Sequence, residues 1–416
     1  MRVSHVPLRR VLAGLRDGTH GTFRRVDDGL PLLSAKNVTH AGLLVSDAES
    51  LISEDDHGSI VRNGFPRRGD VLLTIVGTIG RSCVYELDNA MAFQRSVGFL
   101  RPRTWVEPRF LDYALKSKPF QEQLALRVKV SAQPGIYLSD LAESPIPLIP
   151  SPRDQSRVVR FLDQETAQVD AMIEAQRELV AALEERLDAV WAKLYLDLTS
   201  SSPPVALRRA ISSIADGPFG SSLTSAHYAD EGARVIRLGN IGVNEFKSMD
   251  EAYIPLDYAA TLSSHEARAG DVVMAGLGDE RMPLGRAAVV PELGPAIVKA
   301  DCYRLRPGEL ISSQYLAWAL SSPPVRNQIG ELARGSTRQR LNTSVAGSVE
   351  IVVPDRQAQD QTVAAFDTQR ARMDAMIDAA NESIALMQER RSALISAAVT
   401  GRIDPRTGHE YPLEDR

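Results

Sequence analysis

The chain has 416 residues, of which 44% are hydrophobic and 24% are charged, and its formal net charge is −5. This length exceeds that of one typical domain, so we expect two or more globular domains. The charge excludes a protein that binds nucleic acid through an overall basic coat, and any such binding must use local patches. Cys83 and Cys302 are too few for a disulfide framework and indicate a reducing compartment.

The hydropathy of the chain predicts no membrane association. The sequence contains no run of about eighteen uncharged apolar residues that could span a bilayer. Its first residues, beginning Met1-Arg2-Val3, show no apolar core of a signal peptide. Together with the two cysteines, these features predict a cytoplasmic protein.

The charge is distributed unevenly along the chain. Residues 1–150 and 201–354 carry net charges of +3 and −1, whereas residues 151–200 and 355–416 carry −4 and −3. Two nearly neutral blocks thus alternate with two acidic blocks, which indicates an internal repeat. Short motifs recur in the same order at offsets of 201 to 205 residues. They are Gly69-Asp70-Val71 and Gly270-Asp271-Val272, Leu100-Arg101-Pro102 and Leu305-Arg306-Pro307, Gly29 with Asn37 and Gly232 with Asn240, and Asp170–Ile173 and Asp374–Ile377.

In chain order, the first block predicts short strands at Val71–Val76 and Val97–Leu100 and a helix at Pro108–Lys116. The second block repeats this alternation. Its expected strands are Val235–Leu238 and Val349–Val353, and its expected helix is Ser313–Leu320. Each block is therefore predicted to be a mixed α/β domain. Glycine-punctuated loops, such as residues 217–222 and 335–340, are the expected places for recognition.

Each acidic block predicts one long helix. Residues 156–196 contain neither glycine nor proline, and a helix over 158–194 would be about 55 Å long at about 1.5 Å per residue. Apolar residues recur at steps of three and four, which is typical of a coiled-coil seam. The expected seam residues are Val169, Met172, Gln176, Leu179, Leu183, Leu187, Val190 and Leu194 in the first helix, and Met373, Met376, Ala380, Ser383, Met387, Arg391, Leu394 and Ala398 in the second. We predict that the two helices pair as an antiparallel coiled coil, the alternative being that each packs on its own block.

Motifs for catalysis are absent from the sequence. It has neither a Gly-x-x-x-x-Gly-Lys-Ser/Thr loop for phosphates nor a Gly-x-Gly-x-x-Gly loop for dinucleotides. It also lacks the Asp/Asn-Pro-Pro-aromatic run of amino-methylating enzymes. The histidines show no metal-ligand spacing, and His20 is better explained as a turn-stabilising residue. We therefore predict no catalytic site, no metal site and no cofactor.

Several motifs together resemble the specificity subunits of type I restriction–modification enzymes. Residues 216–223, followed by Gly232 and residues 235–241, resemble the opening of that family's target-recognition domains. Residues 17–22 and 29–38 resemble a variant of the same opening. The other matching segments are Phe93–Val97, Leu100-Arg101-Pro102, Asp154-Gln155 with Phe161-Leu162-Asp163, and Val399–Asp404. The resemblance covers nearly the whole chain.

Two departures from the internal repeat stand out. The second block has Lys299-Ala300-Asp301 where the first has Gln94-Arg95-Ser96. Asp360-Gln361 repeats Asp154-Gln155, but Phe366 then follows after one residue fewer than Phe161 does. Neither departure weakens the resemblance as a whole.

The resemblance implies a division into residues 1–150 and 201–354 as target-recognition domains, 151–200 and 355–400 as coiled-coil helices, and 401–416 as a C-terminal tail, with an internal pseudo-twofold repeat. Each recognition domain would read one half of a bipartite, asymmetric target in double-stranded DNA. The helices would set the distance between the halves, about one helical turn or ~34 Å. The family's subunit is non-catalytic and recruits methyltransferase subunits, usually two, and, in the full complex, restriction subunits with motor and nuclease activity.

DNA recognition predicts a set of polar contact residues, because phosphate contacts position a protein and base contacts specify the sequence. The candidates are Lys36, Asn37, Arg67, Arg68, Arg81, Gln94 and Arg95 in the first block, and Ser221, Ser222, Arg237, Asn240, Arg281, Arg338, Gln339 and Arg340 in the second. Residues that differ between the blocks are the better specificity candidates, whereas Asn37 and Asn240 occupy repeated positions that can be purely structural. The alternative interpretation is a two-module coiled-coil adaptor that binds protein or glycan partners without recognising DNA.

Overall fold

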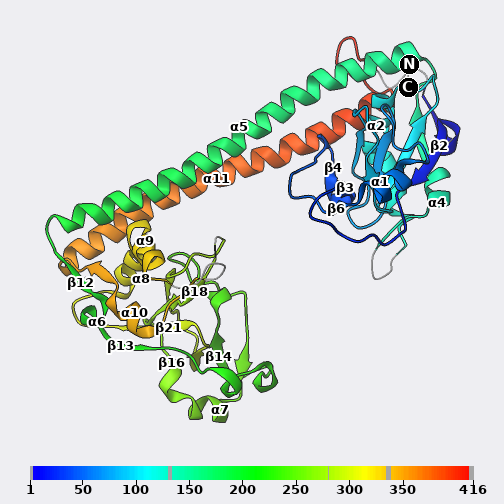
Figure 1. Ribbon diagram of the computed structural model, residues 1–416. Coiled ribbons are helices and arrows are strands. Elements are labelled where there is room, and N and C mark those ends of the chain that lie inside the picture. Colours follow the sequence, from blue (N-terminus) through cyan, green and yellow to red (C-terminus); the bar gives the residue numbers. More distant parts are fainter. Residues whose placement is uncertain (1–2, 130–133, 280, 334–338, 412–416) are drawn as a thin grey trace. The chain divides into compact units, whose positions relative to one another are not determined.

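The computed structural model describes residues 3–129, 134–279, 281–333 and 339–411. Its contacts divide the chain into a first unit, Met1–Arg177 with Asn381–Arg416, and a second unit, Glu178–Ala380. Each unit contains one globular block of mixed α/β structure and one half of each long helix (Figure 1). The predicted mixed α/β fold with two long helices is confirmed.

The first unit is built on an antiparallel sheet in the order β2-β10-β7-β8, beside a smaller sheet in the order β6-β3-β9. Strand β7 is buried at every position because both of its faces are covered. Val71 and Leu73 belong to the core that contains α2 and α3, whereas Leu72 packs with Leu33 and Phe93 of the smaller sheet. The elements are β1 (Ser4–Pro7), β2 (Leu12–Asp17), β3 (Leu30–Leu33), β4 (Val38–Thr39), β5 (Gly42–Leu43), β6 (Leu51–Ile52), α1 (Glu54–Val61), β7 (Val71–Thr74), β8 (Ser82–Val84), β9 (Ala92–Phe93), β10 (Val97–Pro102), α2 (Pro108–Lys116), α3 (Lys118–Ala125), α4 (Leu138–Ala142) and β11 (Pro145–Leu148).

The second unit repeats this order of elements. Its sheets run β13-β21-β17-β19 and β15-β14-β20-β16, and strands β14 and β20 are parallel, as β3 and β9 are in the first unit. The elements are β12 (Pro204–Ala206), α6 (Leu207–Ala210), β13 (Ile211–Ala215), β14 (Ala233–Ile236), β15 (Tyr253–Ile254), α7 (Leu256–Thr261), β16 (Glu266–Ala267), β17 (Val272–Ala275), β18 (Leu277–Gly278), β19 (Ala287–Val289), β20 (Ala296–Val298), β21 (Cys302–Pro307), α8 (Ser313–Ser321), α9 (Pro323–Leu332), β22 (Gln339–Arg340), α10 (Thr343–Ser348) and β23 (Glu350–Val352). All four predicted strands and both predicted short helices are confirmed.

Two of the repeated motifs are partners of each other in space. The Asp70 carboxylate accepts hydrogen bonds of 2.8 and 2.7 Å from Arg101. Asp271 accepts two of 2.9 Å from Arg306 in the same way. The Gly-Asp motif and the Leu-Arg-Pro motif of each block therefore recur together, because they form one buried ion pair.

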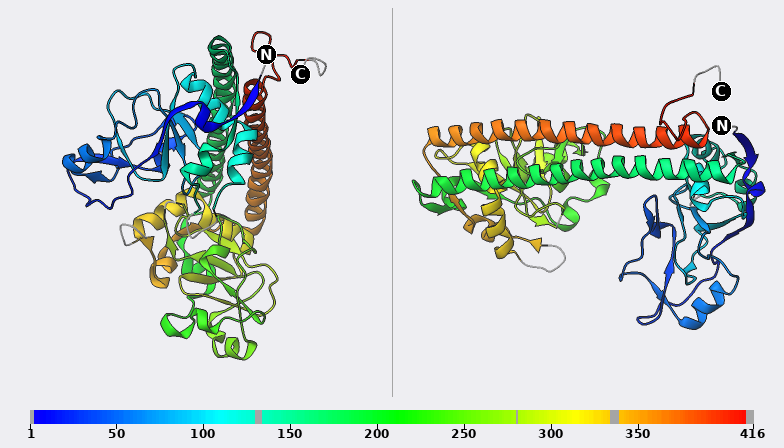
Figure 2. Two further views of the ribbon diagram at one scale, coloured as in Figure 1. Left: turned by 90° about the vertical axis from the view of Figure 1, so that its right-hand side faces the viewer. Right: turned by 90° about the horizontal axis from the view of Figure 1, so that it is seen from above.

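The two long helices, α5 (Pro152–Thr199) and α11 (Arg356–Val399), pack together (Figure 2). In the first unit Asp170 of α5 accepts a 2.8 Å hydrogen bond from Arg391 of α11. In the second unit Trp191 of α5 lies 4.4 Å from Phe366, measured between ring centroids. As residue numbers rise along α5 they fall along α11, which confirms the antiparallel pairing.

The expected seam was wrong at Met172, Met376 and Leu179, whereas the expected seam residue Met373 is buried. Met172 and Met376 are 44% and 43% exposed, and Leu179 is 40% exposed, so all three lie outside the seam. Ile173, at 5% exposure, is buried in place of Met172. Apolar residues stand side by side in the sequence at 172–173 and 179–180, so the apolar pattern alone fits either neighbour.

The apparent one-residue shift near the start of α11 was also a misalignment. Gln155 is fully buried, and its side-chain oxygen accepts a 2.8 Å hydrogen bond from the Glu107 N–H. Gln359, not Gln361, has this role in α11, accepting a 2.9 Å bond from the Ser312 N–H. When Gln359 is aligned with Gln155, Phe366 aligns with Leu162, and both side chains are buried. In this alignment no residue is missing from the second copy.

Among the described residues, no helix is long and apolar enough to cross a membrane. Cys83 and Cys302 are free thiols and both are buried. Burial raises the pKa of the Cys83 thiol to about 12, which keeps it protonated and unreactive at neutral pH.

Candidate nucleic-acid interface

The opening segment of each unit packs against one particular loop. A Cβ atom at Gly18 would lie 2.3 Å from the carbonyl oxygens of Phe93 and Gln94. At Gly217 it would lie 2.0 Å from the carbonyl carbon of Lys299. Only glycine fits this close approach of two backbones, which explains the Asp-Gly that opens both copies. The contact brings the opening segment beside the tripeptide that differs between the two copies.

These segments lie at one end of each four-stranded sheet, which we call the loop edge. It is the end at which β2 and β7 finish and β10 begins in the first unit, and at which β13 and β17 finish and β21 begins in the second. In the first unit the loop edge carries Arg81, Gln94 and Arg95, and Arg95 donates its N–H to the Thr19 carbonyl oxygen at 2.9 Å. Arg81 and Arg95 are exposed, so their guanidinium groups are accessible.

Not every candidate of the first unit lies at the loop edge. Arg67 and Arg68 precede β7 and therefore lie at its opposite end, where Arg68 forms a 2.7 Å ion pair with Asp88. Lys36 forms a 2.7 Å ion pair with Glu49, and the hydrogen bond from Lys36 lowers the pKa of the Glu49 carboxyl. The structure thus separates Arg67 and Arg68 from the group formed by Arg81, Gln94 and Arg95, whereas Lys36 follows Ala35, whose N–H donates to the Ser96 hydroxyl beside that group at 3.0 Å.

Asn37 and Asn240 have a structural role, which corrects the prediction that they contact DNA. Both are buried, with exposures of 2% and 0%. The Asn37 side-chain amide donates to the Leu44 carbonyl oxygen at 2.9 Å, and that of Asn240 donates to the Lys247 carbonyl oxygen at 2.8 Å. Each also accepts a 2.8 Å bond from the backbone N–H three residues earlier. Because both ends of each amide are used inside the fold, neither residue is free to read a base.

The loop edge of the second unit contains a cluster around Arg340. Arg340 lies in β22, which pairs with β18, and forms a 2.8 Å ion pair with Asp301. Its guanidinium carbon lies 5.5 Å from the centroid of the Phe219 ring. Asp216 joins the cluster, because its Oδ1 accepts the N–H groups of Gly217 and Asp301 at 2.7 and 2.9 Å. Asp301 and Phe219 were not predicted as site residues, although the departure at residues 299–301 pointed to the first of them.

The other candidates of the second unit lie on β22, on the loop after β18, in the turn 220–222 and directly after β14. Gln339 and Arg281 are exposed, on β22 and on the loop after β18. Ser222 is exposed in the short turn 220–222, in which Ser221 also lies. Arg237 follows β14 and is paired with Asp250. Arg338 lies outside the described residues.

The carboxyl group of Asp216 is expected to titrate near neutrality. Its burial raises its pKa from 3.8 to about 6, and the nearby Asp301 adds to the rise. Since the pKa is higher in the folded state, protonation stabilises the second unit, and this stabilisation is lost as the pH rises from about 4 to about 6. A carboxyl ¹³C resonance that titrates with a midpoint near 6, and that disappears in Asp216→Asn, would support this. A midpoint near 4 would contradict it.

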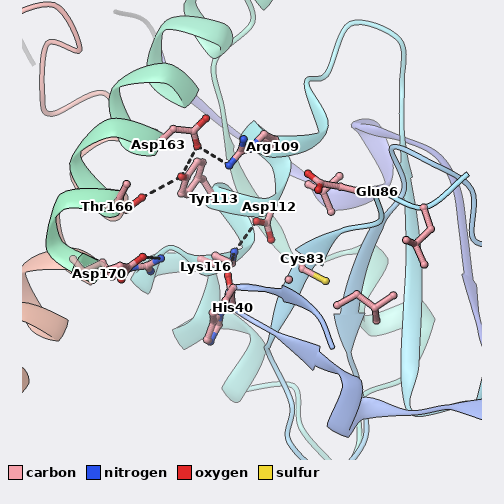
Figure 3. Close-up of a pocket in the computed structure, with 17 residues that line it drawn as sticks. His40, Cys83, Glu86, Arg109, Asp112, Tyr113, Lys116, Asp163, Thr166 and Asp170 are labelled. Carbon is pink, nitrogen blue, oxygen red and sulfur yellow. Dashed lines mark hydrogen bonds and ion pairs between the residues drawn. The ribbon is translucent and has the colours of Figure 1, made fainter. Parts of the chain in front are cut away.

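The first unit also has a polar crevice of about 530 Å³ between α2 and the long helices. Figure 3 shows that Arg109 and Tyr113 of α2 point to Asp163 of α5, at 3.0 and 2.7 Å. Lys116 binds Asp112 at 2.7 Å. The contacts of Arg109 and Tyr113 with Asp163 thus link α2 to α5 across the crevice. Among the described residues, no three His, Cys, Asp or Glu side chains gather as a metal site.

Repeated α/β blocks with matching loop edges, each joined to paired long helices, define a two-module α/β protein with a helical pair. No protein-family model matches the chain. The chain is 26% identical over 171 residues to the specificity subunit of the type I restriction enzyme EcoBI of Escherichia coli, and 24% identical over 184 residues to that of StySPI of Salmonella potsdam. These matches cover 41% and 44% of the chain but only 35% and 39% of the length of the curated relatives.

One solved structure resembles the chain over nearly its full length. It comes from work on complex assembly and conformational transition of the type I restriction–modification system. The likeness covers 96% of this chain and 98% of that one, with a TM-score of 0.64 and 18% identity. At this identity the likeness shows that the two chains share a fold.

Proposed function

We propose that the protein is the DNA-reading specificity subunit of a type I restriction–modification complex and recognises a bipartite, asymmetric target. The main observation behind this proposal is that the two loop edges have the same scaffold but different side chains. The two units share their scaffold, down to the Asp70–Arg101 and Asp271–Arg306 pairs, but differ in the side chains of their loops. A shared scaffold with different loops fits two related modules that read two different half-sites. The likeness to known specificity subunits supports the same conclusion.

In this proposal, residues 1–150 and 201–354 are the target-recognition domains. Arg81, Gln94 and Arg95 contact the first half-site, and the second is contacted by Ser222, Arg281, Arg338, Gln339 and Arg340. Lys36, Arg67, Arg68, Ser221 and Arg237 are left as contacts to phosphates or to flanking DNA, which position the protein without specifying the sequence. The paired helices set the distance between the half-sites.

The proposed partners are two methyltransferase subunits and, in the full complex, restriction subunits, within the cytoplasm. The chemistry of the complex then lies in these partners, and this chain supplies recognition. Large apolar side chains exposed on the long helices offer surface for protein docking in this proposal. They are Met172, Leu179, Leu196, Met376 and Leu386, with exposures of 44%, 40%, 53%, 43% and 59%.

The proposal is tested by selection from a random DNA library. The full chain, mixed with a type I methyltransferase subunit, is expected to enrich duplexes with two conserved blocks separated by a spacer of fixed length. Because part of the binding comes from phosphate contacts, the affinity should also fall steeply as salt rises. Binding with no sequence preference and no salt dependence would instead favour a protein-binding or glycan-binding adaptor.

A further inference from the structure

We infer that Arg340 is the specificity-determining residue of the second unit and that it reads a guanine in the major groove. This inference rests on the proposed function. It adds which side chain makes the contact, which base is read and which unit reads it.

The first argument is the restraint on the Arg340 side chain. One edge of the planar guanidinium group is held by the 2.8 Å ion pair with Asp301, and the face of the group lies over the Phe219 ring. The side chain nevertheless remains 51% exposed. An unrestrained surface arginine loses rotamer freedom when it binds a ligand, which weakens binding. Arg340 has lost much of that freedom already, and the guanidinium group still has N–H donors that Asp301 does not use.

The second argument is the rigidity of what holds Arg340. Asp301 has a left-handed backbone conformation with φ of +65°, which is uncommon for residues other than glycine although aspartate tolerates it better than most. Its N–H donates to Asp216 at 2.9 Å, and its carbonyl oxygen accepts the Gly276 N–H at 2.8 Å. On the other side, the Leu341 N–H donates to the Gly276 carbonyl oxygen at 2.9 Å. The arginine and its partner are therefore both tied to the end of β17, as a precise contact requires.

The third argument is that the first unit uses the same positions differently. Ser96 stands where the second unit has Asp301, and its hydroxyl accepts the Ala35 N–H at 3.0 Å. His20 stands where the second unit has Phe219, and it bonds back to Asp17 at 2.7 Å. The restrained arginine is thus specific to the second unit, as expected of a residue that reads only one of two different half-sites.

Guanine is the base that fits this side chain. It presents two acceptors, O6 and N7, side by side in the major groove, and the planar guanidinium group donates to both at once. Lysine carries the same charge but has a flexible, rotatable ammonium group in place of the rigid planar fork, so it holds this paired contact less precisely. A good paired contact discriminates against the wrong base by roughly 5- to 150-fold.

The test compares Arg340→Lys, Asp301→Asn and Arg209→Ala in the full chain with its methyltransferase partner. Arg209 is an exposed arginine of α6 and serves as the matched control. Each variant is bound to the target selected by the unaltered protein and to every single-base change in it. We expect Arg340→Lys to lose between 5- and 150-fold of discrimination at one guanine in one half-site, and Asp301→Asn to lose part of it there. Arg209→Ala should keep the full preference at that guanine.

Other outcomes overturn the inference in distinguishable ways. If the unaltered chain selects a bipartite target but Arg340→Lys keeps its preference at every position, Arg340 does not read a base. If Arg340→Lys weakens all sequences equally, the contact is to phosphate. If the unaltered chain selects no sequence at all, the proposed function fails, and this inference fails with it. Circular dichroism of each variant establishes that it is folded.

Discussion

Replacing Leu183 by aspartate is expected to disrupt the paired helices, whereas the same replacement at Leu179 is expected to be tolerated. The two leucines lie one turn apart on α5, but Leu183 is 6% exposed and Leu179 is 40% exposed. A leucine truncated in a core costs about 2–5 kcal/mol. An unpaired charge left in that core costs several kcal/mol more, so we expect Leu183→Asp to lower the free energy of unfolding by at least about 4 kcal/mol. For the exposed Leu179 we expect a change of no more than about 1 kcal/mol.

Urea unfolding followed by circular dichroism measures both effects, and the unaltered chain gives the reference. Equal destabilisation by the two variants would contradict the seam seen in the structure. An unaffected Leu183→Asp variant would argue against helix pairing itself. With DNA, Leu183→Asp should also lose the fixed spacer between half-sites, while each half-site alone is still recognised. Loss of recognition at both half-sites would contradict the modular proposal.

The helix pair shows how far an apolar pattern can be interpreted. The absence of glycine and proline over residues 156–196 predicted a continuous helix, because these are the two residues that most strongly interrupt one. The seam was predicted only in part. At Met172 and Ile173 both neighbours are apolar, so the choice depends on which face the partner helix covers. That face is determined by tertiary contacts, such as Asp170 with Arg391, which the pattern of one helix does not contain.

The repeat was predictable from the sequence, but its physical cause was not. Gly-Asp and Leu-Arg-Pro recur in both halves at nearly the same offset, and this signals a common fold. The aspartate and the arginine of the first copy are 31 residues apart, however, so nothing local reveals that they bind each other. The error at Gln361 has the same origin. Gln155 and Gln359 correspond because each holds a backbone N–H of its own block, a contact that the short Asp-Gln motif does not indicate.

The candidate site was predictable as a set of loops rather than as a set of contacts. Residue type and loop position directed attention to Arg95 and Arg340, which the structure places at the two loop edges. The same two criteria also favoured Asn240, whose side-chain amide is hydrogen-bonded inside the fold and does not face solvent. Residue type alone does not distinguish a polar side chain that faces solvent from one that braces a turn. Asp301 and Phe219 were missed because an acidic and an apolar residue are poor DNA ligands by themselves, and they matter through Arg340.

Removing Arg101 is expected to destabilise the first unit more than removing Arg306 destabilises the second. Asp70 is 1% exposed, and Arg101→Ala would leave its carboxylate buried without a counter-charge, which costs about 3–5 kcal/mol. Arg101 also donates to the Gly64 carbonyl oxygen at 2.7 Å and lies 3.7 Å from the Phe65 ring centroid. Asp271 is also buried, but the Arg306 side chain is 34% exposed against 15% for Arg101, so water reaches the arginine end of this pair more readily. For Arg306→Ala we expect a loss of about 2–3 kcal/mol.

Hydrogen exchange measured peptide by peptide separates the two effects. Arg101→Ala should reduce protection in β10, and Arg306→Ala should reduce it in β21, because each arginine belongs to the strand that its loss would loosen. The double variant Asp70→Asn with Arg101→Met is the control, since it removes both charges and should cost less than Arg101→Ala alone. If the double variant is as unstable as Arg101→Ala, then lost packing, rather than the unpaired Asp70 carboxylate, accounts for most of the lost stability. Equal losses for Arg101→Ala and Arg306→Ala would show that solvent exposure does not distinguish the two pairs.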